Sequence, residues 1–196
     1  MLFKLSNRVL IASISFFGSI DILVNNNGGP PSRDFRDLDR EAILEGVIQN
    51  MVTPIELTKM VIDETLRLYP PAWVIGRLAL EDDQIGGYHV PKNTNCLLPV
   101  YYIHRDPKYW DEPLKFKPER FNAENSKGRH KFVYFPFGGG PRLCIGNNFA
   151  LMEMQLVVPM LVRAYSLKKA KGFEFKKEPL VTMRPSPHLK MVINKR

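Results

Sequence analysis

The sequence predicts a helix-rich α+β fold. Apolar residues recur at the spacing of an amphipathic helix over about 37–60, 55–68 and 147–165. Short segments over 74–100, and again near the C-terminus, have the alternating pattern and turn residues of β-strands. With 196 residues, 44% of them hydrophobic, the chain is long enough to bury the core of one or two domains.

The N-terminal part is predicted to form a strand, a turn and two helical segments. Ile20–Val24 is a short apolar run that suits a strand, and asparagine, glycine and proline residues over 25–31 close it. The helix over about 37–60 should be kinked or interrupted at Pro54, which lacks the N–H that a helix interior needs. A second helix, Ile55–Leu68, should end before the sequence Tyr-Pro-Pro, because proline cannot continue a helix and restrains its predecessor.

The middle of the chain is predicted to consist of short strands and loops. Residues 74–100 have the pattern of a β-meander, with turns at Gly86–Gly87 and over 91–95. Residues 104–131 carry many prolines and charges with little periodicity, so an ordered loop with brief helical turns is expected there.

The C-terminal part is predicted to contain one long helix and a β-hairpin. Asn147 or Asn148 could cap the helix, which should run to about residue 165. Its apolar side chains form one stripe: Phe149, Met152, Leu156 and Met160. The final residues alternate apolar with polar side chains, as the strands of a hairpin do.

The most specific segment is the glycine-rich run over 137–146, which reads Phe-Gly-Gly-Gly-Pro-Arg-Leu-Cys-Ile-Gly. Its glycines permit positive φ and let the backbone pass close to a flat ligand. Cys144 lies just before the predicted helix, where backbone N–H groups can stabilise a thiolate, and Arg142 can pair with a carboxylate. No further soft ligands have the spacing of a zinc site. One thiolate, one arginine and one aromatic therefore suit a haem, with sulfur on iron and arginine on a propionate.

This segment resembles the haem-binding loop of the cytochrome P450 family, whose pattern is F-x-x-G-x-R-x-C-x-G. The five fixed positions are filled by Phe137, Gly140, Arg142, Cys144 and Gly146. The resemblance implies haem b (iron protoporphyrin IX), with the Cys144 thiolate as axial ligand of the iron. It also implies that Phe137, Gly138, Arg142 and Gly146 line the cofactor.

Two further motifs support the resemblance. Glu-Thr-Leu-Arg over 64–67 is similar to the E-x-x-R helix of the family, and Lys-Pro-Glu-Arg-Phe over 117–121 is similar to a second signature. Glu64 and Arg67 are three residues apart and share a helix face. The resemblance implies that Arg120 joins them in a buried cluster that braces the haem loop.

Three other residues are weaker candidates for the same site. The resemblance suggests Arg77 as a second propionate partner, with an ordinary strand arginine as the alternative. His104 and His130 could contact a propionate or the loop, and a surface position is the alternative for each. The similarity runs from about residue 61 to 196 and corresponds to the C-terminal third of a full monooxygenase.

Residues 16–60 resemble a different family, the short-chain dehydrogenases. The run Asn-Asn-Asn-Gly over 25–28 is similar to the N-N-A-G turn that follows a central strand in that family, with Asn27 where alanine is usual. The dinucleotide fingerprint G-x-x-x-G-x-G and the catalytic Tyr-x-x-x-Lys are both missing. Reductase activity is therefore not expected.

The two resemblances predict a chain of two parts. Residues 1–60 would be a dehydrogenase-like fragment that is not a complete domain, and residues 61–196 a haem-binding region. The join between them is expected over 53–62, where the sequence could continue the helix of either family.

The resemblance implies a haem-thiolate monooxygenase that inserts one oxygen atom from O₂ into a small organic substrate of unknown identity. Its electrons would come from a donor protein of the reductase, ferredoxin or flavodoxin type. The long distal helix of the family, with its acid–alcohol pair, has no counterpart here, so the chain is expected to be truncated and of low activity. Two alternatives remain. One is a non-catalytic fusion remnant or a protein that only binds haem, and the other is an NAD(P)-dependent short-chain reductase.

Charge and cysteine content limit the partners and the cellular location that can be expected. The net charge of +8 is concentrated over 115–131 and 163–177, and such a face could meet nucleic acid, anionic lipid or an acidic protein. No nucleic-acid-binding motif is present, so no nucleic-acid partner is expected. Two cysteines far apart give no disulfide framework, which fits a reducing compartment. The apolar run near the N-terminus is too short to span a bilayer, so no transmembrane segment and a cytoplasmic location are expected.

Overall fold

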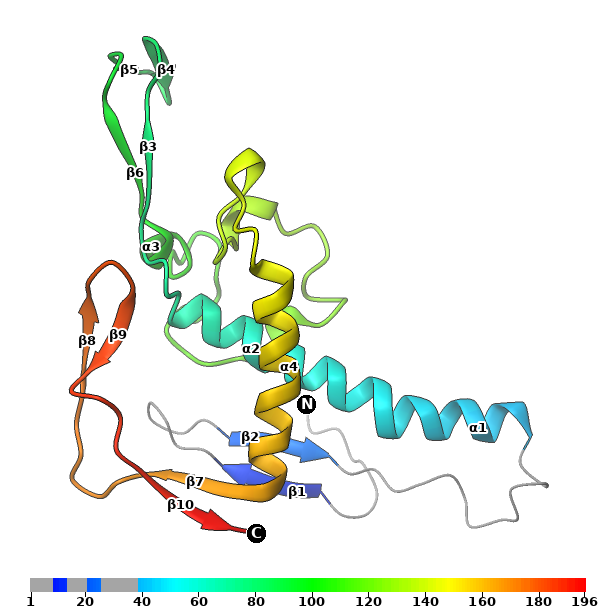
Figure 1. Cartoon of the computed structure of the whole chain (residues 1–196). Helices are drawn as coiled ribbons and strands as arrows, with labels where there is room; N and C mark the ends of the chain where they lie inside the picture. Colours follow the sequence, from blue (N-terminus) through cyan, green and yellow to red (C-terminus); the bar gives the residue numbers. More distant parts are fainter. Residues whose placement is uncertain (1–8, 14–20, 26–38) are drawn as a thin grey trace.

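The computed structural model describes residues 9–13, 21–25 and 39–196 of the chain. Helices cross one another at the centre, and two-stranded antiparallel sheets extend from them (Figure 1). The predicted helix-rich α+β fold is confirmed. No helix within the described ranges is both long and apolar enough to cross a membrane.

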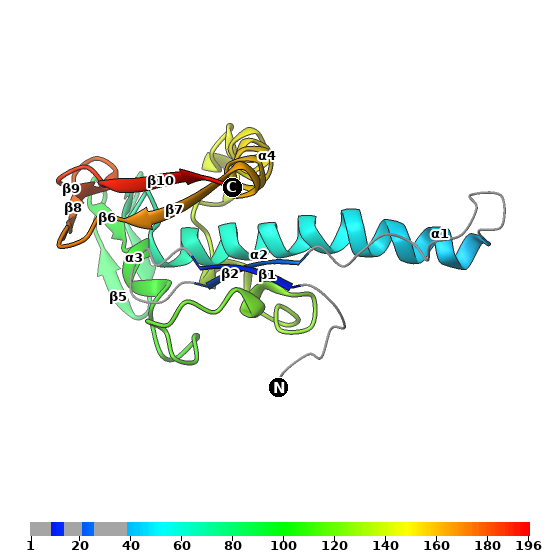
Figure 2. The same ribbon diagram turned by 90° about the horizontal axis from the view of Figure 1, so that it is seen from below.

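The longest helical stretch runs without a break from residue 40 to residue 68 (Figure 2). It consists of α1 (Arg40–Val47), a π-helical turn (Ile48–Val52) and α2 (Thr53–Leu68). The predicted kink or interruption does not fall at Pro54 itself, which lies in the first turn of α2; the regular α-helical pattern changes just before it, in the π-helical turn. The wider π-helical turn immediately before it changes the hydrogen-bonding pattern where the missing N–H would otherwise leave a gap.

The ends of this helical stretch follow from local chemistry. The Asp39 side chain accepts a hydrogen bond of 2.8 Å from the backbone N–H of Ala42 and so caps α1. The chain leaves the helical conformation at Tyr69, the residue before Pro70. The predicted end of the helix at Leu68 is therefore confirmed.

The N-terminal strands form a separate antiparallel pair. β1 (Val9–Ser13) pairs with β2 (Asp21–Asn25), and Ile11 lies opposite Leu23. A strand at this place was predicted over residues 20–24. The asparagine- and glycine-rich turn that follows lies almost wholly outside the described residues.

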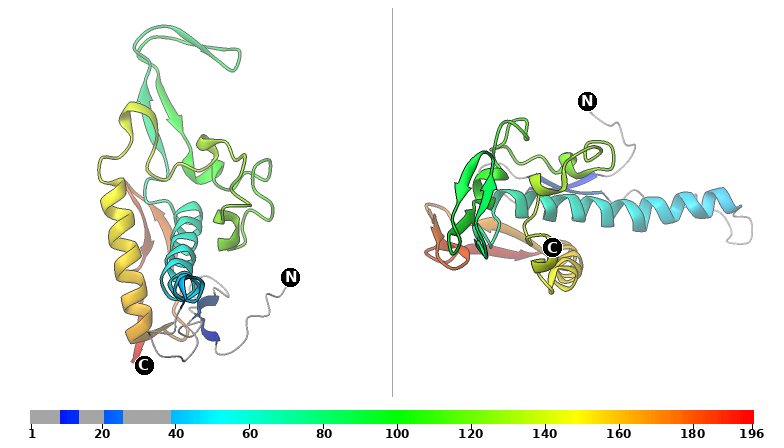
Figure 3. Two further views of the ribbon diagram at one scale, coloured as in Figure 1. Left: turned by 90° about the vertical axis from the view of Figure 1, so that its right-hand side faces the viewer. Right: turned by 90° about the horizontal axis from the view of Figure 1, so that it is seen from above.

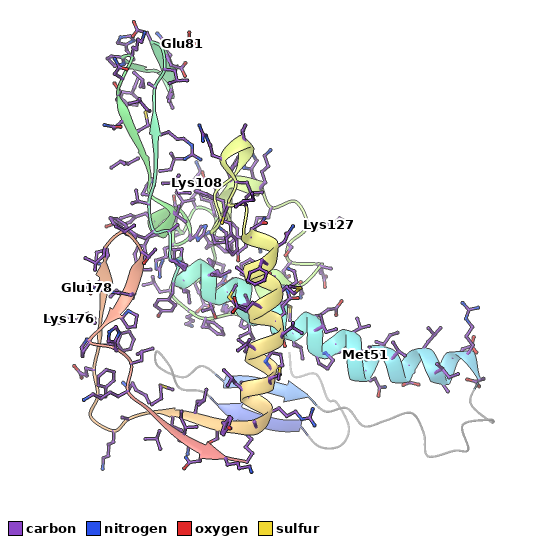
Figure 4. All side chains as sticks on the ribbon, viewed as in Figure 1. Met51, Glu81, Lys108, Lys127, Lys176 and Glu178 are labelled. Atoms are coloured by element: carbon purple, nitrogen blue, oxygen red, sulfur yellow. The ribbon has the colours of Figure 1, made fainter. Side chains whose placement is uncertain are left out.

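Four short strands form an arm that projects from the core. β3 (Ile75–Leu78) pairs with β6 (Asn95–Leu98), and β4 (Asp83–Ile85) pairs with β5 (Tyr88–Val90) farther out. Gly86 and Gly87 both have positive φ and form the predicted turn. Figure 4 shows Glu81 near the tip of the arm, far from Met51 on the long helix.

The segment between the arm and the cysteine loop contains only short helices, as predicted. They are α3 (Val100–Ile103) and the 3₁₀ turns Pro118–Phe121 and Lys131–Val133. A further 3₁₀ turn, Gly140–Arg142, lies within the cysteine loop itself.

The C-terminal part begins with α4 (Asn147–Ala164), which crosses α2 and is seen beside the end-on long helix in Figure 3. The N-cap residue is Gly146, and no side chain caps the helix. The prediction that Asn147 or Asn148 caps it is therefore wrong. The predicted hairpin is present as two nested pairs. Its strands are β7 (Tyr165–Lys169) with β10 (Met191–Lys195), and β8 (Lys176–Pro179) with β9 (Met183–Ser186).

The core lies between α2 and the segment over 100–135. Its buried apolar side chains come from α2, from the segment over 100–135 and from α4: Ile62, Leu66, Leu68, Val100, Trp110, Val133, Phe135 and Val162. In the described part of the chain, polar or charged residues are buried with them: Asp63, Glu64, Arg67, His104 and Arg120. A core with so many buried polar groups is stable only if these groups satisfy one another.

The predicted apolar stripe of α4 is exposed in this structure. Phe149, Met152, Leu156 and Met160 are each more than half exposed, with values from 52% to 70%. They share one helix face, as their spacing predicted, but that face does not contact the core. The part of the helix that packs inward is marked by Val162, which is buried.

Candidate functional site

The cysteine loop doubles back so that its two ends lie side by side. The backbone N–H of Cys144 donates to the carbonyl oxygen of Phe137 at 3.0 Å, and that of Gly138 donates to Phe135 at 2.9 Å. Beyond the cysteine, the N–H of Asn147 donates to the Cys144 carbonyl oxygen at 3.2 Å and leads into α4. The position of Cys144 is thus set by backbone hydrogen bonds on both sides.

The glycines of the loop are required for different reasons. Gly138 and Gly140 have positive φ, +78° and +68°, which side chains rarely tolerate. Gly139 is extended, but a Cβ there would lie 2.6 Å from the Phe132 ring. Gly146 has a negative φ of −87°, so it does not share the left-handed conformation. A Cβ at Gly146 would lie 3.9 Å from the Cys144 sulfur, which places this glycine directly beside the candidate ligand.

The loop packs on the first strand of the arm. A Cβ on Gly138 would lie 3.5 Å from the Ile75 Cδ1 atom in β3. Arg77, two residues farther along β3, is exposed and donates from Nη1 to the Gly76 carbonyl oxygen at 2.8 Å. The structure therefore brings the strand that carries Arg77 to the cysteine loop.

The side chains at the surface of the loop have the chemistry that a haem requires. Cys144 is a free, exposed thiol, Arg142 is exposed, and Phe137 is half-buried. Leu143 and Ile145 on either side of the cysteine are also exposed, at 47% and 103%. A sulfur ligand, apolar side chains and a guanidinium thus face solvent together, and they fit a flat apolar macrocycle with acidic groups at its edge.

A metal site made of protein side chains alone is not found. No three His, Cys, Asp or Glu side chains gather as metal ligands among the residues for which the structure gives positions.

The structure brings together the three charged residues supplied by the E-x-x-R motif and by the motif over 117–121. The guanidinium of Arg67 makes two hydrogen bonds to the carboxylate of Glu64. Nε donates to Oε2 at 2.6 Å, and Nη2 donates to Oε1 at 2.8 Å. Both side chains are fully buried. Arg120 Nε lies 3.4 Å from Glu64 Oε1, an ion-pair distance without hydrogen-bond geometry. Glu64 also accepts from the Lys117 N–H at 2.8 Å, so the carboxylate is well satisfied.

Arg67 also holds the loop segment that follows α3. Its Nη1 atom donates to the carbonyl oxygens of His104 and Pro113, each at 2.7 Å, and Nη2 donates to Lys115 at 3.2 Å. Its guanidinium carbon lies 4.9 Å from the centroid of the Trp110 ring. One arginine on α2 thus fixes three backbone positions of a segment that has little regular structure of its own.

The two histidine candidates differ sharply in environment. His130 is exposed, and its Nδ1 accepts from the Phe132 N–H at 3.3 Å. His104 is fully buried, and its Nε2 accepts from the Phe135 N–H at 3.0 Å. Burial, together with the positive charges of Arg67 and Arg105, lowers the pKa of His104 to about 4, so the ring is neutral. The alternative that His104 lies at the surface is therefore wrong.

Sequence reasoning missed a buried polar contact that joins α2 to the segment before the loop. The Tyr134 hydroxyl donates to Asp63 Oδ1 at 3.0 Å and lies 3.1 Å from the Asp63 carbonyl oxygen. Burial and the neighbouring Asp63 carboxylate raise the pKa of Tyr134 above its ordinary value. The only available signal was the position of Asp63 directly before Glu64, and a lone aspartate on a helix does not reveal a partner 71 residues away.

Comparison with known proteins identifies relatives of most of the chain. A family model described as "Cytochrome P450" matches residues 40–192. Cytochrome P450 3A6 of Oryctolagus cuniculus is 44% identical over 117 residues, which are 60% of this chain and 23% of the relative. Cytochrome P450 3A7 of Homo sapiens is 43% identical over 120 residues, or 61% and 24%. The chain thus spans about a quarter of the length of these relatives.

Solved structures give the same result. The crystal structure of the cytochrome P450DA heme domain superposes with a TM-score of 0.67 at 30% identity, covering 71% of this chain and 31% of that one. A mutant heme domain of the same protein gives a TM-score of 0.68 at 29% identity.

The comparisons do not support the resemblance of residues 16–60 to short-chain dehydrogenases. The family match begins at residue 40, inside that segment. In the described part of the chain, β2 pairs only with β1 and in antiparallel fashion, whereas a dinucleotide-binding sheet is mostly parallel. A turn motif of four residues is too short to distinguish a dehydrogenase from an ordinary strand end.

Proposed function

Since the chain belongs to the cytochrome P450 family, we propose that it binds haem b through the thiolate of Cys144. The observation that carries this proposal is the loop itself. An exposed thiol lies between two apolar side chains, next to Gly146, and its position is set by hydrogen bonds to Phe137 on one side and from Asn147 on the other. A ligand held in this way needs little reorganisation to bind iron.

The remaining residues of the site have supporting roles in this proposal. Arg142 and Arg77, both exposed near the loop, would pair with the haem propionates. Phe137 would pack against the macrocycle, and Gly138 and Gly146 would let it approach the backbone. The Glu64–Arg67–Arg120 cluster would brace the segment beneath the loop without contacting the cofactor.

We further propose monooxygenation as the reaction, with one oxygen atom of O₂ inserted into a small organic substrate. Haem supplies the oxygen-activating chemistry when it is bound, and a cysteine thiolate ligand favours O–O cleavage by donating electron density to iron. The chain's contribution is to hold Cys144 as a thiolate and to orient the cofactor through its propionate partners. Electrons would come from a reductase, ferredoxin or flavodoxin type of donor, and the basic stretches over 115–131 and 163–177 offer it a complementary surface.

The cofactor proposal is tested by reconstituting the full chain with haem and recording the spectrum of the reduced CO complex. Wild-type protein should show the strongly red-shifted Soret band of thiolate ligation, and Cys144→Ser should abolish it. Cys96→Ser is the matched control, since Cys96 is the other cysteine of the chain. It lies in β6, opposite Arg77 of β3 in the strand register. Haem uptake without the red-shifted band in wild type, or its survival in Cys144→Ser, would refute Cys144 as the ligand.

The monooxygenation proposal has its own test, which is the ratio of hydrogen peroxide formed to reducing equivalents consumed by the haem-loaded chain. A ratio close to one indicates haem binding only, and a low ratio with product formation indicates monooxygenation.

A further inference from the structure

His104 is a buried group whose bonding the proposed function leaves unexplained. It is the C-cap residue that directly follows α3, and it is fully shielded from solvent. Nε2 accepts a hydrogen bond from the Phe135 N–H at 3.0 Å, so the ring proton must reside on Nδ1. Backbone groups of Arg67 and Leu66 in α2 interact with the ring, although Nδ1 makes no bond of normal hydrogen-bond geometry among the described residues. The bond at Nε2 is therefore the ring contact that ties His104 to the segment before the cysteine loop.

That hydrogen bond lies at the base of the cysteine loop. The Phe135 carbonyl oxygen accepts from the Gly138 N–H at 2.9 Å, and the Phe137 carbonyl oxygen accepts from the Cys144 N–H at 3.0 Å. A short series of backbone contacts therefore connects the imidazole to the candidate ligand. The ring is also packed against its neighbours, with its centroid 5.3 Å from that of Tyr134 and 5.4 Å from that of Phe135.

His104 is held from the opposite side by the buried charged cluster. Its carbonyl oxygen accepts from Arg67 Nη1 at 2.7 Å, and Arg67 is fixed by Glu64. Its backbone N–H donates to the Val100 carbonyl oxygen at 2.9 Å. The residue thus joins the Glu64–Arg67 pair, through its backbone, to the loop, through its side chain.

We propose that His104 is a positioning residue for Cys144, and that its neutral imidazole fixes the base of the loop and thereby the place of the sulfur. The inference rests on the proposed haem ligation by Cys144 and assigns no contact between His104 and the cofactor. An acceptor at Nε2 is the essential property, since the Phe135 N–H is buried with it and would otherwise be unsatisfied. A ring that only filled space would not need that acceptor.

Two amide substitutions separate the acceptor from the volume of the side chain. In His104→Gln the side-chain carbonyl oxygen can reach the place of Nε2, whereas in His104→Asn the shorter side chain reaches only the place of Nδ1. With haem-reconstituted full-length chain, the readout is the ratio of thiolate to non-thiolate Soret bands in the reduced CO complex. We expect His104→Gln to stay near wild type and His104→Asn to lower the ratio about ten-fold, the effect of one unmade buried hydrogen bond.

Hydrogen exchange on the haem-free chain provides a readout that does not depend on the cofactor. His104→Asn should remove the protection of the Phe135 and Cys144 amides, and His104→Gln should retain it. Amides of α2 serve as the internal reference, so a loss confined to the loop is distinguished from global unfolding. The proposal is overturned if His104→Asn leaves loop protection and band ratio unchanged, or if His104→Gln loses both as His104→Asn does. A wild-type chain without the thiolate band refutes the proposed function, while the exchange experiment still decides whether His104 fixes the loop.

Discussion

Replacing Arg67 by methionine tests whether the buried charged cluster holds the fold together. Methionine keeps a long, flexible, helix-compatible side chain and removes only the guanidinium. In the variant, the fully buried Glu64 carboxylate would lose both of its short hydrogen bonds to Arg67. It would keep the Lys117 N–H and the more distant Arg120. The carbonyl oxygens of three backbone positions would also lose a donor.

The expected effect is large. Breaking a buried ion pair by removing one partner costs about 3–5 kcal/mol, because it leaves an uncompensated buried charge. The unsatisfied carbonyl groups act in the same direction. Since the total free energy of unfolding of a domain is only about 5–15 kcal/mol, Arg67→Met should unfold a substantial fraction of the protein or lower its midpoint of denaturation severely.

The assay is equilibrium unfolding in urea, followed by tryptophan fluorescence, to which both Trp73 and Trp110 contribute. Arg163→Met is the matched control, because Arg163 lies near the end of α4 and is exposed. It should change the free energy of unfolding by no more than about 0.5 kcal/mol. A loss below about 1 kcal/mol in Arg67→Met would refute the reasoning.

Two further predictions concern the histidine and the glycines. The pKa of His104 is about 4 in the folded chain against an ordinary 6.5. The unfolded chain therefore takes up the proton first, and stability present above pH 6.5 should fall by roughly 3 kcal/mol between pH 6.5 and 4, at about 1.4 kcal/mol for each unit of pKa. Urea unfolding at several pH values should show a shallower dependence in His104→Gln, and an equal dependence would contradict the assignment. Gly139→Ala places a Cβ 2.6 Å from the half-exposed Phe132 ring, which must move aside, so the free energy of unfolding should drop by about 1 kcal/mol. Gly76→Ala is its control, because a Cβ there meets nothing within 4 Å; equal losses in the two variants would mean that close packing at Gly139 is not the cause.

Elements whose ends depend on local chemistry could be predicted from the sequence. The end of α2 at Leu68 follows from the two prolines after Tyr69, and the turn of the arm follows from Gly86–Gly87, both of which have positive φ. These features need no knowledge of distant contacts. The change of helix type before Pro54 was not predictable in the same way, because a π-helical turn has no sequence pattern of its own.

Side-chain environments were predicted less well than element positions. The apolar stripe of α4 was recognised from its spacing, but only the structure shows that Phe149 and Met160 face solvent. Likewise, the surface alternative for His104 could be rejected only when its ring was seen against Tyr134 and Phe135. Periodicity shows which side chains share a face, and burial depends on what lies opposite.

The sequence by itself determined the candidate ligand, since a single thiol in the loop over 137–146 has the residue types and spacing of a haem-thiolate site. It also singled out Glu64, Arg67 and Arg120 as charged residues with a shared role. Only the tertiary structure decided how these parts are connected. Arg67 reaches backbone positions up to 48 residues away, and His104 accepts from Phe135, 31 residues farther along the chain. Such pairings cannot be predicted from local sequence, because hydrogen bonds across the core depend on how the chain folds back on itself.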